Sequence, residues 1–533
     1  MAQFDFIVIG AGSAGCVLAN RLSENGRYSV LLIEAGGSDR HPVLQVPLAA
    51  GLAYFWKSFN WGYEIVPQRH MDNRTIPWPR GKVLGGSSSI NGMMYMRGNR
   101  ADYDQWAQMG LTGWSYDDVL PLFMKSEDHA DRNDAFHGTG GPLRVVRAKA
   151  DHPLYDAFLT AGMANGAAPN DDFNGADQEG LGRYDFNYRG GRRESSATAF
   201  LRPAQGRSNL TVWTKTNVNR LSLENGRIGS VVVSRNGGPD EVVTPNCEVI
   251  LSAGAINTPL LLEQSGIGRP DVLEECGIAC QRAALGVGEN LQDHLGVYLT
   301  YRCNQPITLY SLFRPDRAIW AGLRAYLFGK GPASAVPLEA GGFLKTRPEL
   351  DIPDIHITFV PGLNLETTQQ GQGQHGYLIN FYQLRPHSRG SVHITGSAGR
   401  GTPAIDPNYL AEESDRQCMR DGVRLAQAIG NTEPLHDYQA DRLSPDRELE
   451  GDDEIDAWVR QGANTIFHPV GTCRMGADDA SVVDPELKFR GIENLRIADA
   501  SVMPTIIGGN TSAPTMMIAE KASQMILSAH EAG

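Results

Sequence analysis

The stretch that decides the fold is residues 4–34, FDFIVIGAGSAGCVLANRLSENGRYSVLLIE. Its apolar start, Phe4 to Ile9, predicts a buried parallel strand, and residues 10–15 predict a tight glycine turn. A helix with one apolar face is expected from Cys16 to Asn25, before a second apolar strand over 28–33. This order of strand, glycine turn, helix and strand is typical of a Rossmann unit.

The turn has the spacing GxGxxG, and each glycine has a physical reason. Gly10 permits the turn, Gly12 lets the backbone approach a pyrophosphate, and Gly15 lets the helix pack against the strand. The second strand ends in Glu34, where a carboxylate accepts hydrogen bonds from a ribose. An acidic residue here favours an unphosphorylated adenosine ribose, so we expect FAD or NAD rather than NADP.

Length and composition limit the class of protein. A chain of 533 residues predicts two domains and enough core to enclose a large cofactor. The net charge of −13 and the pI near 5.5 argue against nucleic acid or an anionic membrane as the main partner, although localised basic patches stay open. Seven cysteines without a paired ligand pattern predict neither a disulfide framework nor a zinc site and suit a reducing compartment.

No signal peptide or membrane-spanning segment is expected, because a strand begins near Phe4 and no apolar run is long enough. We therefore predict a cytoplasmic protein, with peripheral contact to the inner membrane left open.

Four further segments carry a family resemblance. They are GKVLGGSSSIN (81–91), CEVILSAGAINTPLLLEQSGIG (247–268), TIFHPVGTCRMG (465–476) and NLRIADASVMPTIIGGNTSAP (494–514). With the first thirty-four residues, they make the chain similar to the glucose–methanol–choline oxidoreductases, which oxidise alcohols with FAD. The likeness is greatest to choline dehydrogenase-like and alcohol dehydrogenase-like bacterial members.

The resemblance implies an α/β fold, α+β overall. A Rossmann-like FAD-binding domain would be assembled from residues 1–150, 200–305 and 455–533. A substrate-binding domain on an antiparallel or mixed sheet would be interleaved with it, over residues 151–199 and 306–454.

Alcohol oxidation needs a base for the hydroxyl proton while a hydride leaves carbon. A neutral imidazole suits that task, and a second polar side chain can hold the oxygen. The resemblance places these catalytic roles on His468 and Asn510. It also implies non-covalent FAD, since Ile90 stands where some members carry a flavin-linking histidine.

The motif and the resemblance together predict a set of cofactor-binding residues. They are Gly10, Gly12, Ser13, Ala14, Gly15, Glu34, Val83, Gly86, Ser87, Asn91, Val218, Ala253, Asp499, Ala500, Asn510 and Thr511.

The substrate stays open at this stage. A primary alcohol is expected, with choline, aliphatic, aryl, polyol and polyether alcohols all compatible. Trp61 and Glu339 suggest a cation, since an aromatic face and a carboxylate suit a quaternary ammonium. The electron acceptor is predicted to be a quinone or a dye. The alternatives are an oxygen-using alcohol oxidase and a hydroxynitrile lyase that keeps FAD only structurally. No metal is expected, and a homo-oligomer stays open.

Overall fold

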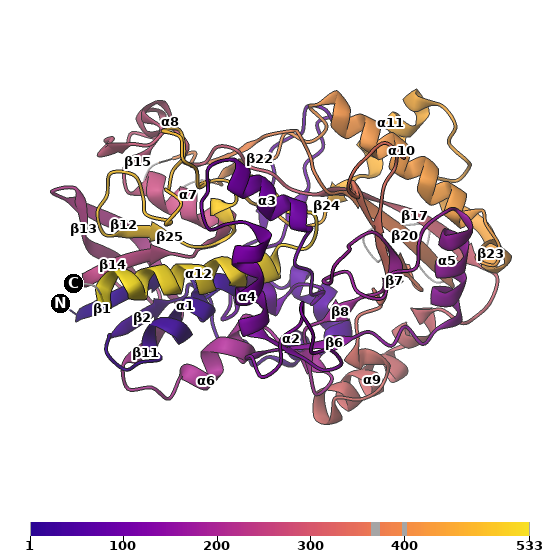
Figure 1. The fold of residues 1–533 in the computed structure, drawn as a ribbon, viewed down its shortest axis with the longest axis horizontal. Coiled ribbons are helices and arrows are strands. Elements are labelled where there is room, and N and C mark those ends of the chain that lie inside the picture. The colour runs from indigo at the N-terminus through magenta and orange to yellow at the C-terminus, as the bar shows by residue number, and fades with distance from the viewer. Residues whose placement is uncertain (1, 364–373, 397–401, 532–533) are drawn as a thin grey trace.

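The computed structural model describes residues 2–363, 374–396 and 402–531, and two seven-stranded sheets organise it. Both chain ends lie beside the first sheet (Figure 1). The N-terminal strand and the C-terminal helix meet there. Both ends of the sequence therefore belong to the half of the protein that is built on the first sheet.

The first sheet has the order β11-β2-β1-β14-β13-β12, with β25 paired to β14. The pairs β11–β2, β2–β1, β1–β14 and β14–β25 are parallel. The pairs β14–β13 and β13–β12 are antiparallel. Its strands are β1 (Ala2–Ile9), β2 (Val30–Ile33), β11 (Leu210–Trp213), β12 (Thr216–Glu224), β13 (Arg227–Arg235), β14 (Asp240–Leu251) and β25 (Leu495–Ile497).

Two helices from opposite ends of the chain pack on this sheet. α1 (Ser13–Ser23) lies against α12 (Ser512–Glu531), the long yellow helix of Figure 1. Arg21 on α1 forms a 2.7 Å ion pair with the buried Glu520 on α12. The apolar residues of β1, β2 and α1 belong to one core with those of α12, so residue 512 onwards completes the unit that residue 4 begins.

The second sheet has the order β23-β17-β20-β19-β18-β7, with β24 paired to β17, and its strand pairs are antiparallel. Its strands are β7 (Gly180–Arg183), β17 (Leu295–Cys303), β18 (Ala340–Leu344), β19 (Ile355–Val360), β20 (Gly376–Gln383), β23 (Gln439–Ser444) and β24 (Asn464–Thr465). Its core also takes residues from α5 (Pro153–Ala164), α10 (Glu413–Gly430) and α11 (Asp452–Gly462).

The remaining helices connect or border these sheets. They are α2 (Pro42–Gln45), α3 (Arg100–Gln108), α4 (Tyr116–Ser126), α6 (Arg202–Ala204), α7 (Gly254–Gln264), α8 (Pro270–Glu275) and α9 (Pro315–Phe328), with the 3-10 turns η1 (Pro47–Phe55), η4 (Leu309–Phe313) and η5 (Pro332–Ser334).

The predicted fold class, a Rossmann-like half with an interleaved antiparallel or mixed sheet, is confirmed. The domain boundaries stay a prediction. β17 and β24 lie in segments that we assigned to the cofactor domain, yet both pair within the second sheet. Among the described helices, none is both long and apolar enough to cross a membrane.

Candidate active site

The glycine turn after β1 has the geometry that its spacing predicts. Gly10 has a φ of +99°, and a Cβ there would lie 2.5 Å from the Ser252 carbonyl oxygen. A Cβ on Gly15 would lie 1.8 Å from the Gly10 oxygen, so only glycine lets α1 approach the turn. Gly12 differs, because its Cβ would meet only the Ser252 oxygen, at 3.9 Å. The free space beside Gly12 leaves its backbone open to a ligand.

Glu34 ends β2 beside this turn. Its carboxylate accepts hydrogen bonds from the backbone N–H groups of Ala11, at 2.9 Å, and Gly36, at 2.8 Å. Burial raises the pKa of Glu34 to about 7, although these two hydrogen bonds oppose the rise. The carboxylate is thus held in place before any ribose arrives.

A cavity of about 1530 Å³ begins at the glycine turn and reaches the second sheet. It is large enough for a dinucleotide and a small substrate together, and most of the predicted residues line it. These are Gly10, Gly12, Ser13, Ala14, Glu34, Trp61, Gly86, Ser87, Asn91, Val218, Ala253, His468, Asp499, Ala500, Asn510 and Thr511. Gly15, Val83 and Glu339 do not line it. Val83 is fully buried in a small core with Leu44, Ala53 and Ile90, and of these four residues Ile90 lines the cavity.

The serine loop after Val83 packs on the glycine turn. A Cβ on Gly86 would lie 2.7 Å from the Gly12 Cα atom, so the two loops share one surface. Arg193, which the sequence did not single out, donates to the Ser88 carbonyl at 3.1 Å and to the Asn91 side chain at 2.8 Å. Burial lowers its pKa to about 10. A buried cation therefore holds the loop that carries Asn91.

The side chain of Asp499 binds the glycine turn at Gly254, where α7 begins, rather than a ligand. Its carboxylate accepts from the Gly254 N–H at 2.8 Å, the Thr258 hydroxyl at 2.6 Å and the Ser501 N–H at 2.8 Å. The carboxylate thus joins the end of β25 to the start of α7. Asp499 and Ala500 both line the cavity.

His468 lines the cavity and follows β24 of the second sheet. The residue before it, Phe467, has a φ of +66°, a conformation that side chains rarely adopt. The His468 N–H donates to the Asp293 carboxylate at 2.6 Å, and that carboxylate also accepts from the hydroxyls of Tyr409 and Thr465. The unusual backbone is fixed by these bonds, as is typical where a functional side chain must be aimed.

A chain of hydrogen bonds assigns the proton on each imidazole. His294 Nε2 lies 3.0 Å from the Leu384 carbonyl oxygen, which only accepts, so Nε2 carries the proton. His294 Nδ1 is then an acceptor, and His468 Nδ1, 2.9 Å away, must donate to it. His468 Nε2 is left with a lone pair and accepts from Asn510 Nδ2 at 3.1 Å. The basic nitrogen of His468 thus points at Asn510 and the cavity.

The surroundings keep His468 neutral. Burial lowers its pKa well below the usual 6.5, and the nearby His294, Arg80 and His356 lower it further. A neutral imidazole can accept a proton throughout the physiological range. The Oδ1 atom of Asn510 is buried without a hydrogen-bond partner among the described residues, so the site keeps one acceptor free for a bound molecule.

The two residues that suggested a cationic substrate have partners of their own within the protein. The ring of Trp61 is covered by the Lys82 ammonium, 4.4 Å from the ring centre, and stacks on Tyr63 at 5.9 Å. Burial raises the pKa of Glu339, whose carboxylate accepts from the backbone of Ala150 and Lys149. The Trp61 ring already contacts one ammonium group, and Glu339 does not line the cavity.

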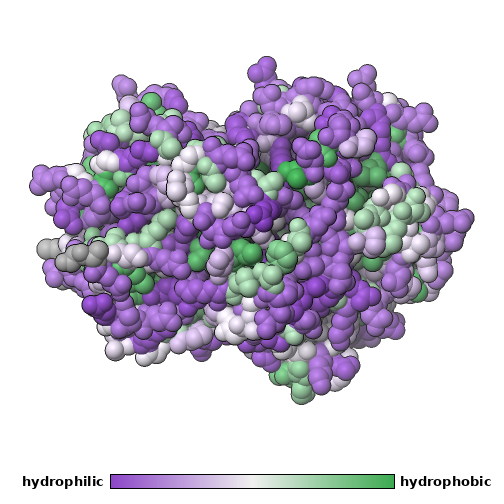
Figure 2. All heavy atoms as spheres, viewed as in Figure 1, coloured by the Kyte–Doolittle hydropathy of each residue, from purple (hydrophilic) through white to green (hydrophobic). Residues whose placement is uncertain are grey.

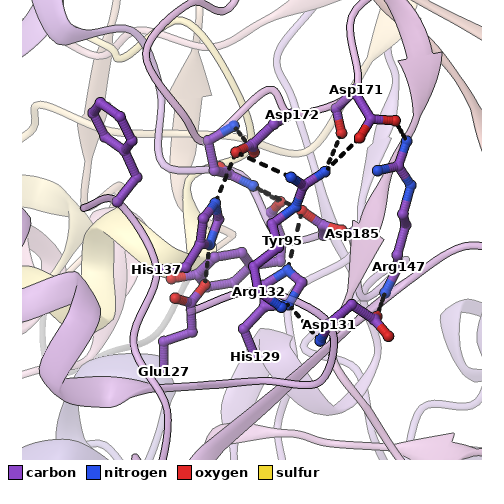
Figure 3. A network of polar contacts seen from close by, with 12 residues as sticks. Tyr95, Glu127, His129, Asp131, Arg132, His137, Arg147, Asp171, Asp172 and Asp185 are labelled. Carbon is purple, nitrogen blue, oxygen red and sulfur yellow. Dashed lines mark hydrogen bonds and ion pairs between the residues drawn. The ribbon is translucent and has the colours of Figure 1, made fainter. Parts of the chain in front are cut away.

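A second polar cluster lies outside the cavity (Figure 3). His137 contacts Glu127 at 3.3 Å and Asp172 at 2.9 Å; burial opposes its charge, but these contacts raise its pKa to about 9. His129 Nδ1 accepts from the N–H groups of Asp131 and Arg132. Glu127 also pairs with Arg97 at 2.9 Å, and His129 Nε2 lies 3.7 Å from the Asp185 carboxylate, so we interpret the cluster as an ion network.

Known proteins match this architecture. Two family models, for the N-terminal and C-terminal parts of GMC oxidoreductases, match residues 4–296 and 386–519. The chain belongs to the GMC oxidoreductases. It is thus an FAD-type oxidoreductase acting on CH–OH donors.

Several relatives span nearly the whole chain. It is 41% identical over 528 residues to the oxygen-dependent choline dehydrogenase of Photobacterium profundum, covering 98% of this chain and 93% of that protein. It is 42% identical over 531 residues to an alcohol dehydrogenase (acceptor) of Pseudomonas putida, covering 98% and 96%. Pyridoxine 4-oxidase from Mesorbium loti has a TM-score of 0.90 at 32% identity, covering 98% of both chains. Formate oxidase from Aspergillus oryzae scores 0.93 at 27% identity, covering 100% and 99%.

Sequence reasoning missed the residues that hydrogen-bond to His468 or lie near it. His294 lies in NLQDH (290–294), a segment to which our predictions gave no role. Asp293 and Arg80 likewise received none. Histidine and aspartate side by side in a loop before a strand were the available signal, but nothing in the sequence shows that residues 294 and 468 meet.

Proposed function

We propose that this protein oxidises a primary alcohol to the aldehyde with FAD, and that His468 is the general base. Bound FAD would supply the hydride acceptor. His468 Nε2 takes the hydroxyl proton, and Asn510 Nδ2 donates to the substrate oxygen. The observation that carries the proposal is the 3.1 Å contact between His468 Nε2 and Asn510 Nδ2, into which a hydroxyl group would insert.

The glycine turn, Glu34 and the serine loop would hold the cofactor. The space beside Gly12 admits a pyrophosphate, and Glu34 faces the same cavity as a ribose partner. α12 begins at Ser512, directly after Asn510 and Thr511, so its positive N-terminal end lies next to the base and favours developing negative charge. The open space at Gly12 and the cavity-facing Glu34 support FAD as the bound cofactor.

We expect FAD to be released by acid. Ile90 is buried and has no nucleophile, and the lining of the cavity holds one histidine, His468, and no cysteine among the described residues. Precipitation with trichloroacetic acid should leave the yellow colour in the supernatant. Colour retained in the washed pellet would show a covalent bond and contradict the expectation.

The preferred alcohol should be uncharged and apolar. Met94, Val336 and Leu338 line the cavity, as does the cation Arg80, whereas the buried Asp293 carboxylate beside His468 does not line it. An ammonium group buried here would lack a partner and meet a like charge, which costs binding free energy.

The comparison that isolates charge is 3,3-dimethylbutan-1-ol against choline, because the two have the same shape. We expect the neutral alcohol to have a kcat/KM at least about tenfold higher, equivalent to roughly 1.4 kcal/mol. A higher kcat/KM for choline would reject the apolar assignment and agree with the choline dehydrogenase relatives.

Anaerobic mixing with an alcohol panel separates the proposed function from a lyase. Bleaching of the flavin supports oxidation, whereas cyanide release from a cyanohydrin without bleaching supports a hydroxynitrile lyase. We propose a quinone as the electron acceptor; relatives are named both oxygen-dependent and acceptor-dependent. Adding air or a quinone analogue to the bleached enzyme compares the two acceptors.

A further inference from the structure

α9 presents an apolar face to solvent. Ile319, Trp320 and Phe328 are 64%, 66% and 68% exposed, and Leu323 and Leu327 are also exposed. Residues 319, 323 and 327 recur every four positions, so they form one stripe along the helix. In Figure 2 hydrophobic side chains gather on the projection at the lower edge of the molecule, where Figure 1 places α9.

The inner side of the same helix is anchored. Ala321 and Ala325 are buried against Val46 and Ala333, in a small core of their own. Small residues thus face the protein while the large apolar residues face outward, which reverses the usual arrangement of a surface helix. The stripe is not exposed because α9 is poorly packed, since the inner side of the helix is already buried against the protein.

The apolar surface continues onto η1. Leu52, Phe55 and Trp56 are 47%, 63% and 41% exposed, and η1 packs beside η5, which contacts α9. The surface made by these three residues and the exposed apolar residues of α9 is called the apolar platform below. Single exposed apolar residues are ordinary, but a group of this size marks an interaction site.

The charge around the platform identifies its partner. Residues 314–330 contain four basic residues, Arg314, Arg317, Arg324 and Lys330, and one acidic residue, Asp316, although the whole chain has a net charge of −13. Arg317 and Arg324 lie on the flank of the stripe at helical spacing. An apolar stripe with Trp, Leu and Phe and with flanking arginines is typical of a helix that lies in the plane of a membrane surface.

We propose that the apolar platform docks this protein on an anionic lipid bilayer. A second copy of the chain is the less suitable occupant, since a two-fold contact would place two cationic α9 helices against each other. The lipid headgroups instead offer negative charge to the arginines, and the acyl region offers apolar contact to Trp320 and Leu323.

The platform also borders the entrance of the cavity. Ala318 and Gly322 of α9, Leu309 and Leu312 of η4, and Leu52 and Phe55 of η1 line the cavity. Docking would therefore turn the entrance towards the bilayer, from which an apolar alcohol could enter without crossing water. This consequence rests on the proposed function, whereas docking itself does not.

Vesicle flotation of the FAD-loaded protein tests docking without any substrate. We expect flotation with vesicles of phosphatidylcholine and phosphatidylglycerol at 7:3, and weaker flotation with phosphatidylcholine alone. Trp320→Glu with Leu323→Glu should lower the partition coefficient at least about tenfold. Neither residue lines the cavity, so flavin reduction by a short alcohol should be unchanged.

Leu285→Glu is the matched control, because Leu285 is 63% exposed but lies outside the platform. It should float like the wild type. Arg317→Gln with Arg324→Gln should lower flotation with the anionic vesicles and leave that with phosphatidylcholine alone unchanged.

Three results would overturn the proposal: no flotation of the wild type, equal loss in Leu285→Glu, or flotation that the α9 variants leave intact. Analytical ultracentrifugation adds a fourth, a wild-type dimer that Trp320→Glu with Leu323→Glu dissociates, which would assign the platform to a second copy. Failure of flotation leaves flavin bleaching by alcohols unaffected, so it is distinguishable from failure of the proposed function.

Discussion

His468→Ala should retain FAD and the fold but lose most alcohol oxidation. In the hydrogen-bonded series His294–His468–Asn510, the Nε2 atom of His468 is the unprotonated imidazole nitrogen that faces the cavity. Loss of a general base typically lowers the rate roughly 10²–10⁴-fold. The phosphate and ribose cradle at Gly12 and Glu34 is elsewhere in the cavity and should be unaffected. Anaerobic stopped-flow reduction of the flavin measures this step directly.

The pH dependence gives a second, independent readout. The deprotonated form of His468 is the active one, and its pKa lies well below 6.5 because of burial, His294, Arg80 and His356. The wild-type rate should therefore stay constant as the pH falls to about 6.5 and decline only below it. His468→Ala should lack that decline.

Asn510→Ala is the matched comparison, because it alters the same hydrogen bond without removing the base. It should slow flavin reduction less than His468→Ala and keep the acidic decline. Wild-type rate and profile in an FAD-loaded His468→Ala would show that His468 is structural and that the mechanism is wrong.

The local parts of the fold were predictable because each follows from short-range chemistry. Residues 4–9 form a strand within β1, and the three glycines of the turn have the separate constraints that their spacing implies. α1 begins at Ser13, three residues earlier than predicted, since Ala14 and Gly15 already have helical geometry. Propensity places such an end only to within a few residues.

Strand pairing was less predictable because it is non-local. β21 (Ser391–His393) pairs only with β22 (Ala404–Asp406) among the described strands and stays outside both seven-stranded sheets. β24, next to the catalytic segment, pairs with β17, about 170 residues earlier. Nothing within either segment specifies its partner.

The site shows the same division. His468 and Asn510 were predicted from their motifs, and the structure brings them within 3.1 Å. His294, which fixes the tautomer of His468, was not predicted. Its role depends on a contact between residues 174 apart in sequence. Glu339 was proposed from its residue type alone, and its carboxylate faces backbone N–H groups instead of the cavity.

The tautomer assignment yields the sharpest test of the site. His294→Leu removes the acceptor for the His468 Nδ1 proton, so the proton can move to Nε2 and block the base. Outer-shell partners that orient a metal-bound imidazole typically contribute about 10–100-fold, and we expect a similar factor here. Flavin reduction in His294→Leu, measured at pH 8 where His468 is neutral in every variant, should fall by about that factor.

His294→Gln separates orientation from packing. The amide oxygen of glutamine can accept from His468 Nδ1 while its NH₂ group donates to the Leu384 carbonyl, so both bonds of the histidine are preserved. We expect His294→Gln to recover most of the rate that His294→Leu loses, at equal FAD content and thermal stability. A role in packing alone predicts the opposite order, because leucine replaces a fully buried ring more readily than an amide does. The ratio of the two rates therefore decides whether His294 controls the proton on His468.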